Sequence, residues 1–550
     1  MKSLILFFSA FMLMIAYNPS SKTPDANDGL SSFSASRLEG YIKTLSSDDF
    51  TGRKPFTEGE TKTVNFLESE LKKIGLEPGN NTSYRQNVPL VSMTCVADSF
   101  MTIKGAKSKF NLKGYKDYVL WTQHAEGASL EDVELVFAGY GVVAPEYNWN
   151  DYEGIDVKGK VVVVFVNDPG FGIGDSTFFK GNTMTYYGRW TFKFEEAARQ
   201  GAKGCLVIHD DVPASYPFAV VQNNWNSSKL YLGDQNSVNT SCAIEGWISL
   251  PALKKLFDAS GFNYAEKLSA AHKNGFRAEA MNLKASTKVK ATPVYNTSGN
   301  VVAQIEGSTH PDEYIIYSAH WDHLGIGKAD EKGDSIYNGA MDNGTGTAGL
   351  LELANVYMSL KTKPERTVVF LFVTAEEQGL LGSAYYAAHP IFPKEKTVAN
   401  INIDGLNIKG KVKDISLIGI GQSDLEDYLK QECEKINRYT TNDPLPSAGY
   451  YFRSDHFHFA KIGIPALYTH SGIDLVEGGK EKGEQLETEY RAKHYHQPSD
   501  EFDPATWQLD GSIDDLKLLF MVGKRLSMES SWPQWKVGSE FKAMRASYMK

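Results

Sequence analysis

Histidine and acidic residues gather in five short motifs of this 550-residue chain. SAHWDHLG, NGAMDNGTG, VTAEEQGLLGS and NINIDGL follow one another between Ser318 and Leu406, and HYHQPSDEFD occupies His494–Asp503. The candidate ligands and catalytic groups in these motifs are His320, Asp322, Asp342, Glu376, Glu377, Asp404 and His496. Five crowded carboxylates would repel one another, whereas a bound dication removes the repulsion and two remove it better. Nitrogen and oxygen ligands without sulfur suit Zn²⁺, with Mn²⁺ or Co²⁺ as alternatives, and two zinc ions ~3.5–4 Å apart are a known hydrolytic arrangement.

Three hydrophobic runs are placed to hold these motifs together. Tyr314–Ala319, Thr367–Thr374 and Val398–Ile403 each have the composition of a buried strand, and each ends beside a motif. Gly344–Leu360 has apolar residues at helical spacing after a glycine-rich start. Strands that alternate with amphipathic helices predict an α/β fold with a mostly parallel sheet. In such sheets the site lies off the carboxyl ends of the strands, so we expect the motif residues to converge there.

Each motif also has an ordinary explanation when it is taken alone. A His near an Asp, as in His320-Trp321-Asp322, is usually a solvated pair. The glycine-rich NGAMDNGTGTAG resembles a phosphate-binding turn but lacks the Lys of a P-loop. A Glu pair at a helix start commonly interacts with the helix dipole, and Asp404 after a strand can be an N-cap. Because four motifs occur in order, each at a strand end, we interpret them as parts of one metal site.

The composition is that of an ordinary globular protein, with 42% hydrophobic and 23% charged residues. The length exceeds that of one hydrophobic core, so we expect two or three domains. A net charge of −10 argues against a nucleic-acid partner, because phosphate binding needs a basic face. The four cysteines are scattered without a C-x-x-C pair, which argues against a cysteine metal site and predicts unpaired thiols.

Residues 1–18 have the features of a secretory signal peptide, with Lys2 followed by the mostly apolar stretch Leu4–Tyr17. A membrane span needs about 20 apolar residues, and this stretch is shorter. No later segment is long and apolar enough to cross a bilayer. We therefore expect an exported protein, periplasmic or extracellular, without a membrane span once the signal is removed; an uncleaved anchor is the alternative.

The predicted domain organisation follows from a change in composition and in predicted secondary structure near Lys116. Residues 116–288 are rich in predicted strands, turns and aromatic residues and contain few candidate catalytic groups. We expect them to form an inserted domain between two parts of a catalytic domain, residues 33–115 and 289–550.

The ordered set of motifs resembles that of the two-zinc exopeptidase family, which includes secreted bacterial aminopeptidases, glutamate carboxypeptidases and the transferrin-receptor ectodomain. The resemblance covers roughly residues 38–112 and 293–528. AGYGVVAPEYNWNDYEGIDVKGKVVVV and GAKGCLVI, in the inserted segment, resemble the protease-associated domain of that family. The resemblance implies a mixed, mostly parallel sheet sandwiched by helices, of the phosphorylase/hydrolase-like kind, with a β-rich insertion.

The positions within the family's motifs imply a role for each residue. His320 resembles the imidazole ligand of the first zinc, and Asp322 the acid that orients it. Asp342 stands where the family has the carboxylate that bridges the two ions. Glu376 matches the general base that takes a proton from the metal-bound water. The other implied ligands are Glu377 for one zinc, Asp404 for the other, and His496 as the remaining imidazole.

A tyrosine hydroxyl stabilises the oxyanion in this family, and two residues match its position in different branches. Tyr451 lies three residues before Ser454, and Tyr495 directly precedes His496; we prefer Tyr451. Gly405 departs from the family, which usually has a large apolar residue after the last aspartate. The other histidines near the motifs are interpreted as structural or surface residues: His323, His456, His458, His470 and His494.

The resemblance implies a secreted zinc-dependent aminopeptidase with two Zn²⁺ per chain, acting on peptide substrates. A carboxypeptidase or dipeptidase of the same family is the nearest alternative, because Arg453 beside the SDH sequence would suit a substrate carboxylate; we interpret Arg453 as an ordinary loop arginine. Glutaminyl cyclase, which uses one zinc on a related fold, is a third possibility. A non-catalytic binding protein on this fold would have lost ligands, and all of them are present here. Nothing in the sequence indicates an oligomeric state.

Overall fold

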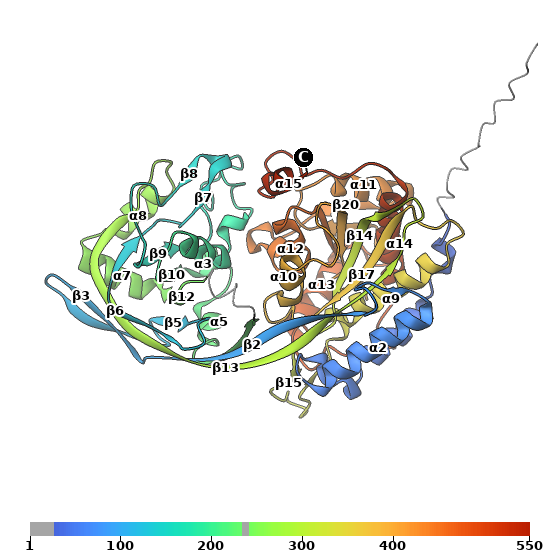
Figure 1. Cartoon of the computed structure of the whole chain (residues 1–550), viewed down its shortest axis with the longest axis horizontal. Helices are drawn as coiled ribbons and strands as arrows, with labels where there is room; N and C mark the ends of the chain where they lie inside the picture. The colour runs from blue at the N-terminus through green and yellow to red at the C-terminus, as the bar shows by residue number, and fades with distance from the viewer. Residues whose placement is uncertain (1–26, 234–240, 550) are drawn as a thin grey trace, which may run out of the picture.

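The computed structural model describes residues 27–233 and 241–549, which form two bodies joined by a ribbon of two long strands (Figure 1). The larger body holds the N-terminal helices and the chain beyond about residue 300, and the smaller body holds most of the chain between them. Each body has its own hydrophobic core. The predicted signal peptide lies outside the described residues. Within the described ranges, no helix combines the length and apolar character needed to cross a bilayer.

Four parallel strands form the centre of the sheet in the larger body. They lie in the order β17 (Arg366–Val373), β14 (His310–His320), β18 (Thr397–Asn402) and β21 (Ala466–Ser471). The hydrophobic runs that predicted three strands fall in β14, β17 and β18. Every residue of β17 and β18 is buried, as expected for parallel strands covered on both faces.

Antiparallel strands extend this sheet at both sides. The end of β13 (Glu279–Ile305) pairs with β17, and β19 (Asp414–Leu417) pairs with β21. β20 (Tyr439–Asn442) then runs parallel to β19. The sheet is therefore mixed and mostly parallel, which confirms the predicted fold class.

Helices cover both faces of the sheet. The core on one face includes side chains of α1 (Ala35–Leu45), α2 (Glu58–Ile74), α9 (Gly346–Met358), α11 (Leu425–Lys435) and α14 (Asp510–Met528). On the other face, α10 (Leu381–Ala388) and α12 (His456–Lys461) pack against residues such as Ile316 and Val369. The helix predicted over Gly344–Leu360 is α9.

Helix α9 is buried on nearly every side, because the sheet lies beneath it and other helices lie over it. Its one charged residue, Glu352, is fully buried. The carboxylate accepts hydrogen bonds from Arg37 Nε at 2.6 Å and from the Ser34 amide at 2.7 Å. A buried carboxylate needs such partners, so this ion pair fixes α1 over α9.

A second parallel sheet forms the smaller body. Its strands are β6 (Ala128–Phe137), β9 (Val161–Phe165), β10 (Gly204–His209) and β12 (Ile244–Ser249), with β5 (Tyr118–Trp121) antiparallel at the end.

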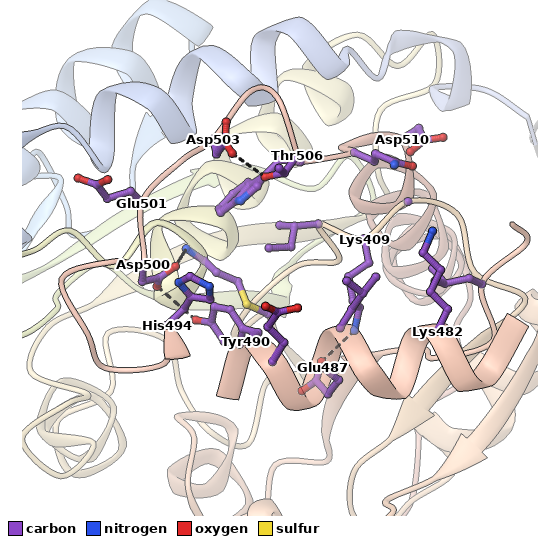
Figure 2. Close-up of a pocket in the computed structure, with 18 of the residues that line it drawn as sticks. Lys409, Lys482, Glu487, Tyr490, His494, Asp500, Glu501, Asp503, Thr506 and Asp510 are labelled. Atoms are coloured by element: carbon purple, nitrogen blue, oxygen red, sulfur yellow. Dashed lines mark hydrogen bonds and ion pairs between the residues drawn. The ribbon is translucent and has the colours of Figure 1, made fainter. Parts of the chain in front are cut away.

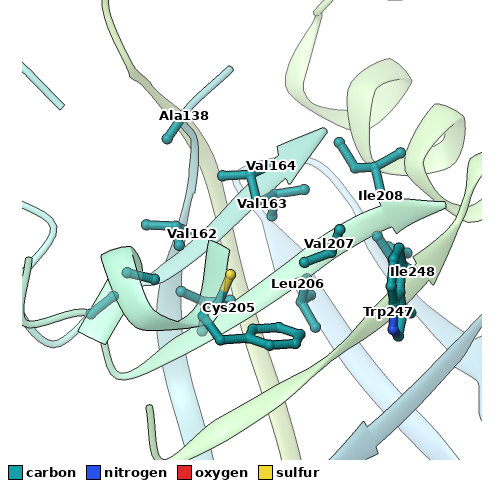
Figure 3. Close-up of a cluster of buried hydrophobic side chains, with 14 of the residues drawn as sticks. Ala138, Val162, Val163, Val164, Cys205, Leu206, Val207, Ile208, Trp247 and Ile248 are labelled. Atoms are coloured by element: carbon teal, nitrogen blue, oxygen red, sulfur yellow. The ribbon is translucent and has the colours of Figure 1, made fainter. Parts of the chain in front are cut away.

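Strands β9 and β10 are buried along their whole length (Figure 3). Helices α3 (Trp190–Arg199) and α7 (Leu250–Ser260) contribute Phe192, Phe194, Leu253 and Phe257 to the same core. Valine-rich runs of this kind are typical of parallel strands between two layers. The assignment of this body as a protease-associated domain stays a prediction.

The ribbon consists of β2 (Arg85–Ala97) and β13, which pair antiparallel from Arg85 opposite Val301 to Ala97 opposite Val289. β13 is 27 residues long and belongs to both sheets, since one end pairs with β17 and the other with β6. The bodies also touch directly, where the Tyr186 ring lies 5.1 Å from that of Phe457.

The described ranges contain further helices and strands. Further helices are α4 (Asp211–Ala214), α5 (Phe218–Gln222), α8 (Tyr264–Ala271), α13 (Gly479–Lys493) and α15 (Lys542–Tyr548). Further strands are β1 (Glu77–Pro78), β3 (Phe100–Gly105), β4 (Lys109–Lys113), β7 (Val143–Ala144), β8 (Trp149–Asn150), β11 (Ser228–Leu232), β15 (Gly325–Ile326) and β16 (Ile336–Tyr337).

Candidate metal centre

The carboxyl ends of β14, β17 and β18 carry the candidate site. β14 ends at His320, opposite Val373, the last residue of β17. Glu376 and Glu377 follow Val373 closely, and Asp404 comes just after the end of β18. Because the three strands are parallel, these residues emerge at one edge of the sheet, as predicted.

Three predicted ligands form a first group around the imidazole of His320. Its Nε2 lies 3.3 Å from Asp342 Oδ1 and 3.2 Å from Asp404 Oδ1. The Glu376 carboxylate is slightly farther, with Oε2 at 3.9 Å.

A second group surrounds His496 and shares Asp342 with the first. His496 Nε2 lies 3.3 Å from Asp342 Oδ2 and 3.2 Å from Glu377 Oε2. Asp342 thus turns one oxygen to each group. Ligands at ~2.0–2.1 Å from a tetrahedral zinc are separated by about 3.3 Å, so the imidazole-to-carboxylate distances in both groups fit that ion.

The surroundings of His320 fix its tautomer. Nδ1 lies 3.1 Å from the carbonyl oxygen of Asp322, which can only accept, so Nδ1 donates and Nε2 is the nitrogen that faces the acidic group. The Asp322 carboxylate, predicted to orient His320, is 3.8 Å from Nδ1. Its Oδ1 instead accepts the Glu376 amide at 3.0 Å. Asp322 therefore positions both residues, with its backbone toward His320 and its side chain toward Glu376.

Several buried polar atoms around the two groups have no hydrogen-bond partner among the described residues. They are Asp322 Oδ2, both ring nitrogens of His323, and Glu377 Oε1. His323 Nδ1 lies 2.6 Å from Glu377 Oε1, but the two groups are not aligned for a hydrogen bond. This distance is shorter than the separation of about 3.3 Å between two ligand atoms of one zinc ion. Buried polar atoms are normally paired, so these atoms indicate a cluster built to be completed by cations. His323, interpreted from sequence as a structural or surface residue, belongs to this cluster.

The pKa values of the carboxyl groups at the site reflect how closely these groups are packed. Burial raises the pKa of Glu376 well above its usual range, and the carboxylates of Asp404 and Glu377 raise it further against the effect of His320. Burial also raises the pKa of Asp322 to about 7. A bound dication would lower these raised pKa values, because it removes the repulsion between the carboxylates.

Two residues outside the predicted set shape the ligand loops. The carboxylate of Asp500 accepts the amides of Met341 and Asp342, each at 3.1 Å. The side chain of Asn343 accepts the amide of Gly405 at 2.9 Å and donates to the Ile403 carbonyl at 3.0 Å. Asp500 therefore orients the shared ligand, and Asn343 ties its loop to the loop that carries Asp404.

Arg53 braces the same region from the N-terminal part of the chain. Its guanidinium is fully buried and donates to the carbonyl oxygens of Trp321 at 2.8 Å, Asn338 at 2.5 Å and Gly339 at 2.8 Å, among others. Burial lowers its pKa to about 10, while Asp500 opposes this shift. One side chain thus joins the loop after His320 to the loop before Asp342. The TGRKPF sequence gave no signal of this role.

A cavity of about 240 Å³ opens beside the ligand groups. It is lined by Asp342, Glu376, Asp404 and His496 together with Tyr450, Tyr468, Tyr495, Arg453, Arg491 and His470, among others. The Tyr495 ring stacks on His496 at a centroid distance of 3.9 Å. Tyr451 does not line the cavity; it is 5% exposed, and its hydroxyl is buried without a partner among the described residues. The geometry therefore favours Tyr495 over Tyr451.

A second, larger cavity of about 800 Å³ lies against α13 (Figure 2). It shares Met341, Glu487 and Tyr490 with the first cavity, so the side chains of α13 separate the two. Figure 2 shows Lys409 reaching Glu487, with Lys409 Nζ 2.8 Å from Glu487 Oε2. It also shows Tyr490 turned toward Asp500. Gly483 is the only residue of α13 that is buried.

The remaining histidines lie around the cavity without joining the ligand groups. His470 lines the cavity, and its Nε2 lies 2.8 Å from the Tyr468 hydroxyl. His456 is fully buried and stacks on Tyr468. His494 Nδ1 lies 3.0 Å from the carbonyl oxygen of Ser499. These positions suit structural or wall residues.

Comparison with known proteins finds a family match that spans the site. Residues 300–521 match Peptidase family M28. The aminopeptidase NAALADL1 of Mus musculus is 38% identical over 113 residues, which cover 20% of this chain and 14% of that protein. A probable zinc metalloprotease of Pyrenophora teres f. teres is 38% identical over 104 residues, covering 19% of this chain and 22% of that protein. The chain thus spans less than a quarter of these curated relatives.

Similar solved structures extend over more of the chain. An aminopeptidase from Aneurinibacillus sp. strain AM-1 is 20% identical, with 92% of this chain and 97% of that chain covered and a TM-score of 0.48. BSAP, a zinc aminopeptidase from Bacillus subtilis, is 19% identical, with 91% and 96% covered and a TM-score of 0.44. On the sequence match, this chain carries a domain of peptidase family M28 between residues 300 and 521.

Proposed function

We propose that this chain is a zinc-dependent exopeptidase that hydrolyses the N-terminal peptide bond of peptides. One observation carries the proposal: Asp342 turns one oxygen to each of two ligand groups, beside a cavity that Glu376 also lines. A shared carboxylate with two imidazole ligands favours two ions per chain, whereas a glutaminyl cyclase uses one. The aminopeptidase NAALADL1 of Mus musculus and that of Rattus norvegicus are among the relatives, which supports the choice of N-terminal cleavage.

The residues that would hold two zinc ions are His320 and Asp404 for one, Glu377 and His496 for the other, and Asp342 for both. When bound, the ions would polarise the scissile carbonyl and make a water molecule acidic near neutral pH. His323, Asp500 and Asp322 would hold the ligands in place, which typically matters 10–100-fold for metal affinity or activity.

Glu376 is placed to move the proton of the reaction. Its amide is held by Asp322, and its carboxylate lines the cavity. It accepts a proton from the attacking water as the new C–O bond forms at the carbonyl carbon. It then returns that proton to the amine as the C–N bond breaks, so that the free amine leaves neutral. The Tyr495 hydroxyl is the available donor for the developing oxyanion.

The substitution Glu376→Gln tests the proposal. It should lower turnover of a peptide amide with a free N-terminus by about 10²–10⁴-fold, since it removes the proton acceptor. Zinc content, measured by mass spectrometry of the metal, should stay at two ions per chain. Near-normal turnover would show that the base is another residue, and equal hydrolysis of N-acetylated peptides would rule out an aminopeptidase.

The substitution Tyr495→Phe tests the oxyanion donor, with Tyr451→Phe as its matched control. Removing an oxyanion donor costs about 10²–10³-fold in kcat, and KM should change little. Tyr451→Phe removes a buried hydroxyl that has no partner, so kcat should stay the same. The opposite pattern would return the role to Tyr451.

A further inference from the structure

Helix α13 is attached only weakly to the larger body. Gly483 alone of its 15 residues is buried, and none of its side chains belongs to a hydrophobic cluster of the described residues. The cavities of about 240 Å³ and 800 Å³ both border it. Elements with few buried apolar contacts open at a lower free-energy cost than the rest of a fold. The helix therefore has both the weak attachment and the adjacent space that a movable element needs.

The residues that follow α13 belong to the candidate metal centre. Tyr495 and His496 come shortly after the helix ends at Lys493, and both line the smaller cavity. His496 is the imidazole of the second ligand group, so its position depends on where α13 lies. A displacement of the helix would take this ligand and the proposed oxyanion donor out of the site together.

Two glycines at the start of α13 allow such a displacement. Gly478 and Gly479 have φ angles of 114° and 70°, which L side chains rarely adopt. A Cβ atom on Gly479 would meet no neighbouring atom within 4 Å, so packing does not explain the glycine there. Hinges are a few residues at the ends of elements that absorb changes of backbone angle. The two glycines lie where a hinge for α13 would have to be.

One ion pair fastens the middle of the helix. Lys409 Nζ lies 2.8 Å from Glu487 Oε2, and the Lys409 side chain is only 8% exposed. Lys409 belongs to the loop that carries Asp404. The fully buried side chain of Asn407 fixes this loop, because it donates to the Gly410 carbonyl at 2.6 Å and accepts the Lys409 amide at 2.9 Å. The ion pair thus joins the loop that carries a ligand of one group to the helix that leads to a ligand of the other.

Other contacts of α13 each involve a neutral hydroxyl. The Tyr490 hydroxyl donates to Asp500 Oδ2 at 3.2 Å, and Arg491 donates to the Tyr450 hydroxyl at 3.1 Å. The ion pair instead joins two full charges, and water screens the attraction of partly buried charges less than that of exposed ones. We therefore expect the ion pair to contribute most to the attachment of the helix.

We propose that α13 is a gate that swings about its two N-terminal glycines. Lys409 is the positioning residue that holds the gate closed through Glu487. The proposal rests on the peptidase function proposed above, because the gate carries His496. In the closed form described here, His496 completes the second ligand group. In the open form the helix lies toward the larger cavity, so that a peptide can enter the site and the products can leave it.

The variant Lys409→Met tests the ion pair, with Lys411→Met as its matched control. Lys411 lines the same larger cavity, but it contacts Asp514 of α14, at 3.6 Å, and not α13. In hydrogen–deuterium exchange of the zinc-loaded protein, the α13 amides of Lys409→Met should exchange about tenfold faster or more, since a charged hydrogen-bonded pair is lost. Those of Lys411→Met should exchange as in the wild type. Equal exchange in the two variants would overturn the proposal.

Zinc affinity tests whether the ion pair positions His496. Lys409→Met should bind the second ion about 10–100-fold more weakly, because its imidazole ligand is held in place less of the time. Competition with a chelating dye measures this, and the affinity for the first ion should stay the same. Lys409→Arg keeps the charge and should restore both the affinity and the slow exchange. An unchanged zinc affinity in Lys409→Met would overturn the positioning role.

A reversible cross-link tests the motion itself. The four native cysteines are buried, so a reducible bis-maleimide should join only the introduced thiols of a Lys409→Cys/Glu487→Cys variant. With the gate locked, a chelator should remove the second zinc ion about tenfold more slowly or less, and reduction of the linker should restore the rate. Equal rates of zinc loss before and after reduction would overturn the gate.

These measurements keep the proposal separate from the proposed function. Amide exchange, zinc affinity and zinc loss do not require turnover, so they support the gate even if the protein hydrolyses no peptide. If it does hydrolyse peptides, the locked protein should also lose turnover until the linker is reduced. Full turnover by the locked protein would overturn the gate and leave the peptidase function standing.

Discussion

Buried charged side chains of the smaller body and those of the candidate metal centre differ in whether their polar atoms have partners. In the smaller body, Lys193 is fully buried and donates to the Tyr187 carbonyl at 2.6 Å. Asp151 accepts the Val142 amide and the Trp149 ring N–H, each at 2.9 Å. In the larger body, buried atoms of Asp322, His323 and Glu377 have no such partner among the described residues.

The difference separates charges that stabilise a fold from charges that await a ligand. Both bodies contain parallel strands with helices, and both shift the pKa values of buried groups. For example, burial lowers the pKa of Lys193 to about 7. Burial and a shifted pKa therefore do not mark a site by themselves. What marks it here is unsatisfied donors and acceptors at strand ends beside a cavity.

The sharpest way to break the comparison is to remove one buried cation from each body. Arg53→Met leaves several buried carbonyl oxygens without donors and should destabilise the protein by about 3–5 kcal/mol, measured by denaturant unfolding. It should also weaken zinc binding, because the loops before Asp342 and after His320 lose their brace.

Lys193→Met is the control for Arg53→Met. It should also destabilise the protein, because Asp168 and Asp151 lose a neighbouring cation. Zinc affinity, measured by competition with a chelating dye, should stay unchanged. If Lys193→Met weakened zinc binding as much as Arg53→Met, the two bodies would not be distinct in this respect.

A milder change tests the orienting residues within the larger body. Asp500→Asn should lower zinc affinity by about 10–100-fold, since the amides of Met341 and Asp342 lose a charged acceptor. Asp503→Asn is the matched control, because Asp503 is an exposed turn residue that contacts Ala505 and Thr506. Equal zinc affinities for the two variants would show that Asp500 does not orient the shared ligand.

The smallest expected effects are on the pH dependence of folding stability, which has opposite signs for one buried glutamate in each body. The pKa of Glu487 falls from 4.5 to about 2, so its contribution to stability is present above pH 4.5 and is lost as the pH falls toward 2. Burial raises the pKa of Glu245 in the smaller body from 4.5 to about 7, so stability is lost as the pH rises from 4.5 through 7.

The variants Glu487→Gln and Glu245→Gln test these two pH dependences of stability separately. The first should reduce the loss of stability in acid, and the second should reduce the loss between pH 4.5 and 7, each by about 1–2 kcal/mol. Unfolding curves recorded between pH 3 and 8 measure both. A change of slope in the same direction for both variants would contradict the assigned shifts.

Much of the larger body could be predicted because its signals are local. Runs of valine, isoleucine and phenylalanine mark β14, β17 and β18, and the motif residues at their ends converge because parallel strands share one edge. The predicted ligands His320, Asp342, Glu377, Asp404 and His496 lie in two adjoining groups. Their roles stay predictions until zinc is measured.

Residues that act on backbone groups could not be predicted. Arg53 contacts carbonyl oxygens far away in the chain, so no spacing in TGRKPF indicates its partners.

Helix α13 has one buried residue, Gly483, and therefore lacks an apolar stripe that would predict a helix. A single 3₁₀ turn directs Tyr450 to the cavity and Tyr451 to the core, and no spacing in the sequence indicates this.

The paired strands β2 and β13 have a consequence for how such a chain can change. Ala97 and Val289 face each other across the ladder, so the chain between them leaves and re-enters at the tip of a hairpin. A short turn joining those two positions would close the hairpin without altering the register of any strand in the larger sheet. A whole globule can therefore be gained, trimmed or exchanged at this point while the order of the catalytic strands stays the same.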